Sequence, residues 1–298
     1  MWVRKSMVSV IQRTKGNSQF YYLKHATSTR QKEKYLGKII PKDIESLKQV
    51  FLLEFYSEEW LPKLIIIKKS HIKEYRRMNK NVKENNLQAF LMEFVYNSQR
   101  MIDSSLTFIE TVELVRDKIT PTRKSQFEMF ETQNCFQLSN TIFKRKKKLT
   151  FPLLKMWHKK MYKKTQNEYS GVLRDYMLKT IGSKQKPLHY KKIEKAMNDY
   201  FDWYSQKKDL HPVLFAGLAY QKFTTISPFG YGNEVIARLV MNVILNNNNY
   251  PMLDIDIRDK SVCLKANEKA QMTKNEVYFL QWFVKYYIKK ISKDYDIE

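Results

Sequence analysis

The first forty residues alternate between apolar and polar side chains, whereas most of the remaining chain repeats its apolar residues at helical spacing. From Val3 to Ile40 the alternating stretch is rich in Val, Tyr, Thr and Ile, which favour strands. Turn signals occur at Gly16-Asn17 and near Ser28. This pattern predicts a three-stranded antiparallel meander.

Helical spacing begins after this stretch. The pattern predicts one helix from Asp43 through Phe55 and a second from Glu58 to about Tyr75. The polar residues 79–86, NKNVKENN, are typical of a linker, so we expect two domains, 1–84 and 85–298.

The second predicted domain reads as helix almost throughout, which makes the expected fold class mainly α. A last helix is expected over residues 277–290, VYFLQWFVKYYIKK. Its aromatic residues either pack inside the domain or form the interface of a homodimer.

The composition adds a large excess of positive charge. Fifty-four Lys and Arg against 30 Asp and Glu give a net charge of +24, which favours anionic partners or simply keeps the chain soluble. The two cysteines lack metal-binding or disulfide spacing, and no apolar run is long enough to span a bilayer. We therefore expect a soluble cytoplasmic protein without a membrane partner.

Much of this charge lies in residues 1–42, which hold ten basic side chains and the single acid Glu33. Phe20, Tyr21 and Tyr22 are interleaved with them. Such a ribbon could follow the phosphate backbone of a nucleic acid, or its charges could be the solvated face of a small sheet. Both interpretations remain open at this stage.

Residues 227–238 read SPFGYGNEVIAR and resemble, without a gap, the motif HPFxxGNGRxxR of the Fic (Fido) family. Flanking segments resemble the family too, including LHPVLFAGLAYQKFTTISPF before the motif and FVYNSQRMIDSSLTFIETVELV at 94–115. The resemblance covers roughly residues 88–290. It implies a Fic-type helical core with a small β-hairpin flap within 168–187, and transfer of AMP from ATP to a target hydroxyl.

The resemblance also implies that several catalytic residues are missing. Ser227 stands at the position of the family's catalytic His and cannot act as a base near neutral pH. Tyr231 replaces the acidic magnesium ligand, and Val235 replaces the first phosphate-clamping Arg. We therefore expect no metal ligand from this chain, and ATP and magnesium as cofactors only if some activity remains.

Other motif residues are retained. Gly232, Asn233 and Arg238 stand at nucleotide-binding positions, while Pro228 and Phe229 match the residues that hold the loop in place. The resemblance thus implies that the scaffold of the site survives the loss of its chemistry.

Glu234 replaces the second glycine of the motif and puts a carboxylate where an anion would bind. It precedes Arg238 by four residues, so we predict an ion pair that blocks the site by occupying this arginine. Alternatively, Glu234 only complements the positive end of the helix. Asp254 and Asp256, two residues apart, are expected to be solvated or to cap a helix.

Neither of two nearby histidines is a convincing substitute base. His211 precedes Ser227 by 16 residues of mostly helical sequence, roughly 20 Å, and His189 reads as a solvated loop residue. Many family members also carry an inhibitory motif, S/T-x-x-x-E-G/N. The matching segment runs from Ser98 to Asp103, SQRMID, and has Ile102 in place of its Glu.

Three functions are compatible with these observations. The first is a Fic-fold binding or regulatory module without AMP transfer, which could still recognise a target protein along the flap, 174–186. The second is a transferase with altered chemistry that modifies a protein hydroxyl from ATP. The third is a nucleic-acid-associated protein that binds through residues 1–42.

Overall fold

The computed structural model describes residues 8–146, 148–178, 187–206 and 209–295. Contacts divide the chain into two compact units, Met1–Ile65 and Ile66–Glu298, and each is described by itself. The sequence-based division into domains 1–84 and 85–298 stays a prediction about independent folding. Within the described residues, no helix combines the length and the apolar character needed to cross a membrane.

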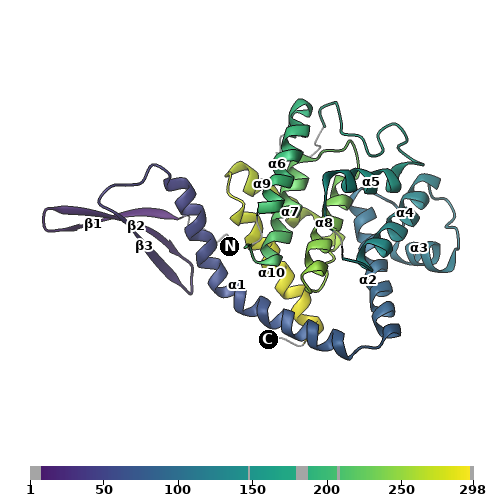
Figure 1. The fold of residues 1–298 in the computed structure, drawn as a ribbon, viewed down its shortest axis with the longest axis horizontal. Coiled ribbons are helices and arrows are strands. Elements are labelled where there is room, and N and C mark those ends of the chain that lie inside the picture. Colours follow the sequence, from purple (N-terminus) through teal and green to yellow (C-terminus); the bar gives the residue numbers. More distant parts are fainter. Residues whose placement is uncertain (1–7, 147, 179–186, 207–208, 296–298) are drawn as a thin grey trace. The chain divides into compact units, whose positions relative to one another are not determined.

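The first unit contains the predicted meander. Strands β1 (Ser9–Lys15), β2 (Ser18–Ala26) and β3 (Gln31–Gly37) pair antiparallel in the order β1-β2-β3 (Figure 1). Gly16 adopts a left-handed φ of +59° in the first turn, a conformation that glycine tolerates without strain. One face of this sheet packs on helix α1 (Ile44–Arg77), where the ring of His25 lies edge-on to Phe55 at 4.6 Å.

Helices α1 and α2 (Lys80–Met101) each correct one prediction. The two helices expected between Asp43 and Tyr75 are one continuous helix that contains Pro62. The predicted linker 79–86 contributes instead to helix α2, whose first turn is capped by the side chain of Asn79. The polar composition of this segment misled the prediction, because Lys80, Lys83 and Glu84 are good helix formers once the Asn79 cap is present.

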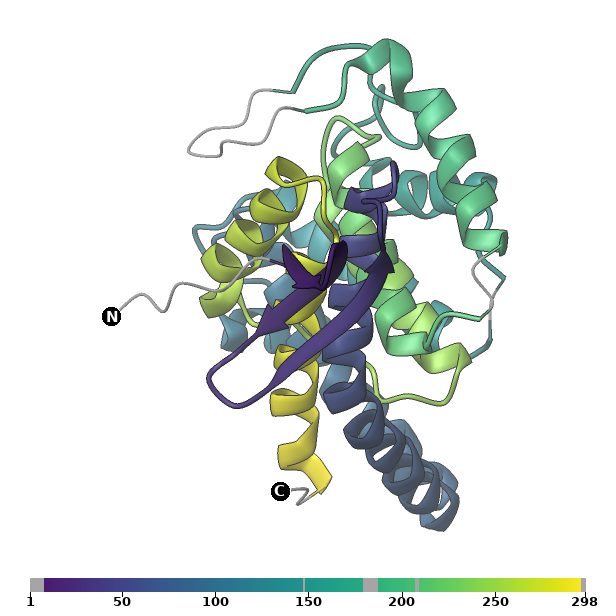
Figure 2. The same cartoon turned by 90° about the vertical axis from the view of Figure 1, so that its left-hand side faces the viewer.

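The second unit is a helical bundle (Figure 1, Figure 2), as expected for a mainly α protein. Its remaining elements are α3 (Phe108–Val112) with a π-helical turn (Glu113–Asp117), α4 (Gln126–Phe143), α5 (Phe151–Tyr162), α6 (Ile193–Gln206), α7 (Pro212–Ile226), α8 (Asn233–Asn247), α9 (Lys260–Met272) and α10 (Val277–Ser292), with short 3-10 turns at Tyr190–Lys192, Ile257–Asp259 and Lys293–Tyr295.

Helices α7 and α8 form the centre of this bundle. Every residue of α8 from Val235 to Leu245 is buried, as expected for a helix packed on all sides. Helix α10 lies close to α7 because Gly217 leaves room for the ring of Phe283: a Cβ at this glycine would come within 2.5 Å of that ring. The aromatic side chains of α10 at 279, 283 and 287 are thus internal packing residues, which leaves the predicted homodimer a prediction.

Arg174, in the described part of the connection from α5 to α6, contacts Ser227, where α7 ends. This connection contains the segment that resembles the family's flap. Residues 168–178 form turns and bends without a strand, and residues 179–186, which would include most of the hairpin, lie outside the described part of the chain.

Candidate functional site

The motif loop, residues 227–232, joins α7 to α8. Ser227 ends α7 with a left-handed φ of +46°, and its N–H donates to the carbonyl of Phe223 at 2.9 Å. Its hydroxyl donates to the carbonyl of Thr224 at 2.6 Å. The position of the family's base is therefore held by a neutral hydroxyl that caps its own helix.

Asn233 fixes the shape of this loop. Its side-chain amide donates to the carbonyl of Phe229 at 2.8 Å, and its Oδ1 accepts from the Phe229 N–H at 2.9 Å. The Phe229 ring is completely buried and stacks on His158 at 3.9 Å between ring centroids. The hydrogen bonds of Asn233 and the buried ring of Phe229 together fix the conformation of the loop.

His158, on α5, is a loop-fixing residue that sequence reasoning missed. Its Nδ1 accepts from the N–H of Gly171 at 2.8 Å, and its Nε2 therefore donates to the carbonyl of Tyr231 at 3.0 Å. Burial lowers the pKa of this imidazole to about 4, so it is neutral at physiological pH and both nitrogens are engaged. Its spacing could have indicated burial, because His158 lies four residues from both Leu154 and Tyr162, on the buried face of α5.

Arg174 was also missed, and it ties the α5–α6 connection to the motif loop. Its guanidinium donates to the carbonyls of Ser227 (2.8 Å), Tyr176 (2.7 Å) and Leu188 (2.7 Å), and its backbone N–H donates to Pro228 (3.0 Å). The side chain is buried, which lowers the pKa of the guanidinium from its usual value. Tyr176, within the predicted flap 174–186, and Leu188, just beyond it, thus meet at one arginine.

Tyr231 fills the position of the family's magnesium ligand. Its hydroxyl lies 3.3 Å from the carboxylate of Glu131, on α4, and 3.4 Å from the carbonyl of Ile102. Burial raises the pKa of Glu131 above its usual value. Tyr231 therefore forms a hydrogen bond to a buried carboxyl group. Its phenol provides no carboxylate oxygen that could bind a hard cation.

The segment that resembles the inhibitory motif lies beside Tyr231. Helix α2 ends within it at Met101, Ser98 is buried, and Ile102 forms the C-cap. Asp103 has a left-handed φ of +68° and pairs with Lys260 at 3.0 Å. The carbonyl of Ile102, rather than a glutamate side chain, is the group that contacts the motif loop here.

The start of α8 retains an anion-binding geometry. Gly232 adopts a φ of +69° at the N-cap, and no side chain caps the first amides of the helix. A Cβ on Gly232 would come within 2.3 Å of the Tyr162 hydroxyl, so only glycine fits. This helix end is the part of the motif that could still hold a phosphate.

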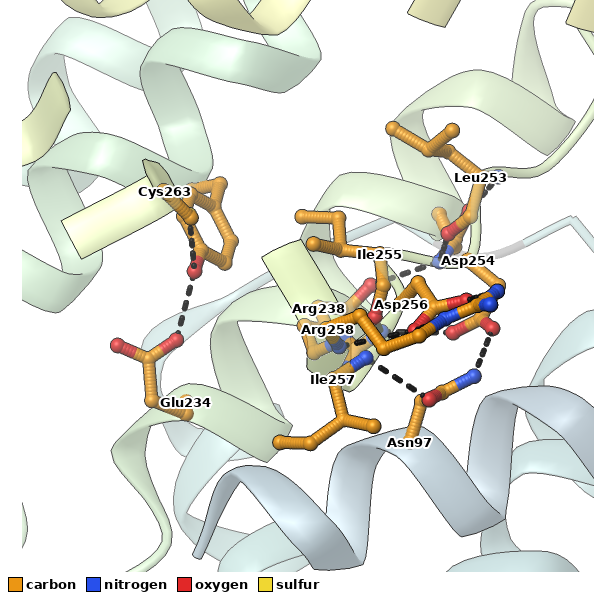
Figure 3. Close-up of polar contacts among 12 residues, drawn as sticks. Asn97, Glu234, Arg238, Leu253, Asp254, Ile255, Asp256, Ile257, Arg258 and Cys263 are labelled. Carbon is orange, nitrogen blue, oxygen red and sulfur yellow. Dashed lines mark hydrogen bonds and ion pairs between the residues drawn. The ribbon is translucent and has the colours of Figure 1, made fainter. Parts of the chain in front are cut away.

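Arg238 is completely buried and turned away from this helix start. Its Nη2 donates to Asp254 at 2.6 Å and also to the carbonyl of Ile255 (Figure 3). Asn97 donates its amide to the second oxygen of Asp254. Burial raises the pKa of the Asp254 carboxyl, against the opposing effects of Arg238 and Asn97.

This pairing corrects two predictions. The prediction of a Glu234–Arg238 ion pair was wrong. Glu234 accepts a hydrogen bond from the hydroxyl of Tyr220 at 2.7 Å, and that hydroxyl lies 3.5 Å from the sulfur of Cys263 (Figure 3). Asp254 is buried rather than solvated or capping. The adjacent predicted acid, Asp256, does cap a helical turn, through the Arg258 N–H at 2.9 Å.

The two candidate substitute histidines have structural roles. His211 caps the N-terminus of α7, at the opposite end of that helix from Ser227, and contacts the Tyr250 hydroxyl at 2.9 Å. His189 caps the 3-10 turn that precedes α6 and accepts from the Lys191 N–H at 3.3 Å. Neither imidazole replaces the base of the motif.

Three positions of the motif differ from what the family resemblance implies for magnesium-dependent AMP transfer. Ser227 cannot act as a base, Tyr231 offers a phenol in place of a carboxylate, and Arg238 is occupied by Asp254. Among the described residues, no group of three or more His, Cys, Asp or Glu side chains is arranged to hold a metal ion. The amides at the start of α8 are the remaining feature that suits a phosphate.

Comparisons with known proteins agree with the geometry. The family model of the Fic/DOC family matches residues 148–245. The protein adenylyltransferase Fic of Nematostella vectensis is 26% identical over 174 residues, which are 56% of this chain. The chain spans only 40% of that curated relative's length.

Solved structures share the fold. A Fic domain containing signaling protein from Bacteroides thetaiotaomicron superposes with a TM-score of 0.70 at 20% identity, over 77% of this chain and 94% of the other. Fic-1 from C. elegans, residues 134–508, gives a TM-score of 0.69 at 15% identity, over 85% and 77% of the two chains. The family-model match over residues 148–245 and the shared fold together support a Fic/Fido domain in this chain.

Proposed function

We propose that this protein is a binding or regulatory module built on the Fic fold, and that it has lost AMP transfer. The observation that carries the proposal is the state of Ser227: its hydroxyl donates to the carbonyl of Thr224 at 2.6 Å, at the position where the family has its base. Loss of a positioned base costs about 10² to 10⁴ in rate.

Two further features support the same conclusion. Tyr231 places a phenol at the metal position, and Arg238 is neutralised internally by Asp254. Each would weaken charge stabilisation of a transferring phosphoryl group. Since the three changes affect different parts of the reaction, reverting one of them does not restore the others.

The direct test is AMP transfer itself. We expect no labelled protein when the purified chain is incubated with ATP labelled at the α-phosphate, magnesium or manganese, and a cell extract. Ser227→His alone also stays inactive, because Tyr231 and the Arg238–Asp254 pair are unchanged. The readouts are autoradiography and the mass increase of AMP on tryptic peptides.

The control for this assay is an active Fic relative in the same extract, which must label its targets. Label above the no-enzyme background with the unmodified chain would contradict the proposal and support altered transferase chemistry. Activity of Ser227→His alone would show that only the base was missing.

Nucleotide binding without transfer is a second candidate function. The uncapped amides at Gly232 and the start of α8 favour it, because backbone N–H groups there can donate hydrogen bonds to a phosphate. Glu234 does not fill this position with its carboxylate, which is directed to Tyr220 instead. Recognition of a target protein along 174–186 stays a prediction. Arg174, the first residue of this segment, is held by its contacts with the carbonyls of Tyr176 and Leu188.

A further inference from the structure

The sheet of the first unit has two chemically different faces. Strand residues alternate between them, so Leu23 and His25 face α1, while Phe20, Tyr22 and Lys24 lie on the opposite side, here called the open face. The face toward α1 contains the buried apolar residues of the unit. The open face carries aromatic and basic side chains from all three strands.

Lysines on the α1 side have acidic partners. Lys34 pairs with Glu54 at 3.3 Å, and Lys32 pairs with Glu58. Glu58 also accepts from Arg30 at 3.0 Å. The positive charge of this side is therefore largely compensated by glutamates of α1.

The open face keeps a surplus of positive charge. Arg13 and Lys24 share the single carboxylate of Glu33, at 2.7 and 3.8 Å. Lys38 lies beside the Phe20 ring, with Nζ 6.0 Å from the ring centroid. Among the residues that the structure describes, Arg13, Lys15, Lys24 and Lys38 on this face thus outnumber the single acid Glu33.

Aromatic rings lie between these cations. The centroids of Tyr22 and Tyr35 are 5.2 Å apart, and those of Phe20 and Tyr35 are 6.3 Å apart. The guanidinium of Arg13 lies over the Tyr22 ring at 5.1 Å. Tyr35, on the edge strand β3, is 54% exposed, so its ring is accessible to a partner.

We propose that the open face binds single-stranded nucleic acid, with bases stacking on the aromatic cluster and phosphates contacting Arg13, Lys24 and Lys38. Exposed rings flanked by cations are what such strands require, because every base offers a π-face and every linkage a negative charge. A duplex hides its base faces and could use only the cations. This activity is independent of the function proposed for the Fic domain.

The test is fluorescence anisotropy of the full chain with labelled dT12 and rU12 at several salt concentrations. We expect saturable binding whose log K falls with log salt at a slope of about −2, for three phosphate contacts. Tyr35→Ala weakens binding roughly 10-fold, the effect of one lost stacking partner, whereas Tyr35→Phe keeps it. The preference between dT12 and rU12 tells whether the natural strand is DNA or RNA.

Lys34→Gln is the matched control for Lys24→Gln. Both remove one lysine charge from the same sheet, but on opposite faces. Lys24→Gln should reduce affinity and make the salt slope shallower by about 0.7, while Lys34→Gln should change neither. Equal effects of the two variants, stronger binding of a duplex, no binding at 50 mM salt, or full binding by a folded Tyr35→Ala protein would each overturn the proposal.

Discussion

Replacing Asp254 with Ala lowers the free energy of unfolding by about 3–5 kcal/mol, the cost of leaving a buried charge without its partner. Arg238 is completely buried, and Asp254 is the carboxylate that it contacts, at 2.6 Å. The substitution also leaves the Asn97 amide without its acceptor. Urea unfolding followed by circular dichroism measures the effect as a lower midpoint with an unchanged slope.

Arg258→Gln is the matched control for this loss. It breaks a second arginine–aspartate pair, with Asp256, whose arginine side chain is 84% exposed. Exposed pairs contribute about 1 kcal/mol or less, so this variant should unfold almost like the unmodified protein. Arg238→Met combined with Asp254→Leu should recover much of the lost stability, because it removes both charges. A loss below 1 kcal/mol in Asp254→Ala would contradict the assignment of a buried pair.

Replacing Arg174 with Met destabilises the protein by roughly 3 kcal/mol, because hydrogen bonds from a charged donor contribute about 1.5–3 kcal/mol each without being additive. The guanidinium joins Ser227, Tyr176 and Leu188 through their carbonyls. Arg174→Lys should retain only part of the stability that Arg174→Met loses, since an ammonium cannot reproduce the planar set of donors of a guanidinium. Urea unfolding gives the stability, and amide exchange should accelerate at Ile226, Ser227 and Phe229, which flank Pro228.

Arg116→Met provides the control for Arg174. It makes the same substitution at an arginine whose side chain is 66% exposed and which pairs only with its neighbour Asp117 among the described residues, so it should cost under about 1 kcal/mol. If the two variants unfolded alike, Arg174 would not be the link between the α5–α6 connection and the motif loop.

The fold could be predicted largely from local pattern. Alternation gave the meander, and helical spacing with Pro228 and Gly232 gave the break between α7 and α8. Local polarity failed at 79–86, because the cap at Asn79 turns these residues into the start of α2. Periodicity describes which face of an element is apolar, but a cap that involves one side chain changes where the element begins.

The chemistry of the site was less predictable, because its polar groups find partners far away in the chain. The local i, i+4 rule favoured a Glu234–Arg238 pair. Arg238 faces the core, however, where Asp254, 16 residues later, supplies the carboxylate. His158 and Arg174 contact the motif loop from 73 and 53 residues away, and spacing along the sequence carries no information about such contacts.

The central claim is that the Fic scaffold of this chain no longer serves nucleotide transfer. Calorimetric titration of ATP with magnesium at low salt tests it most directly, with Asp254→Asn as a comparison that frees Arg238 from its ion pair. The account predicts no saturable heat for the unmodified protein up to about 1 mM ATP, the concentration that corresponds to a binding free energy near −4 kcal/mol. Saturable binding well below that concentration would contradict this prediction and would favour the second candidate function, nucleotide binding at Gly232 and the start of α8 without transfer.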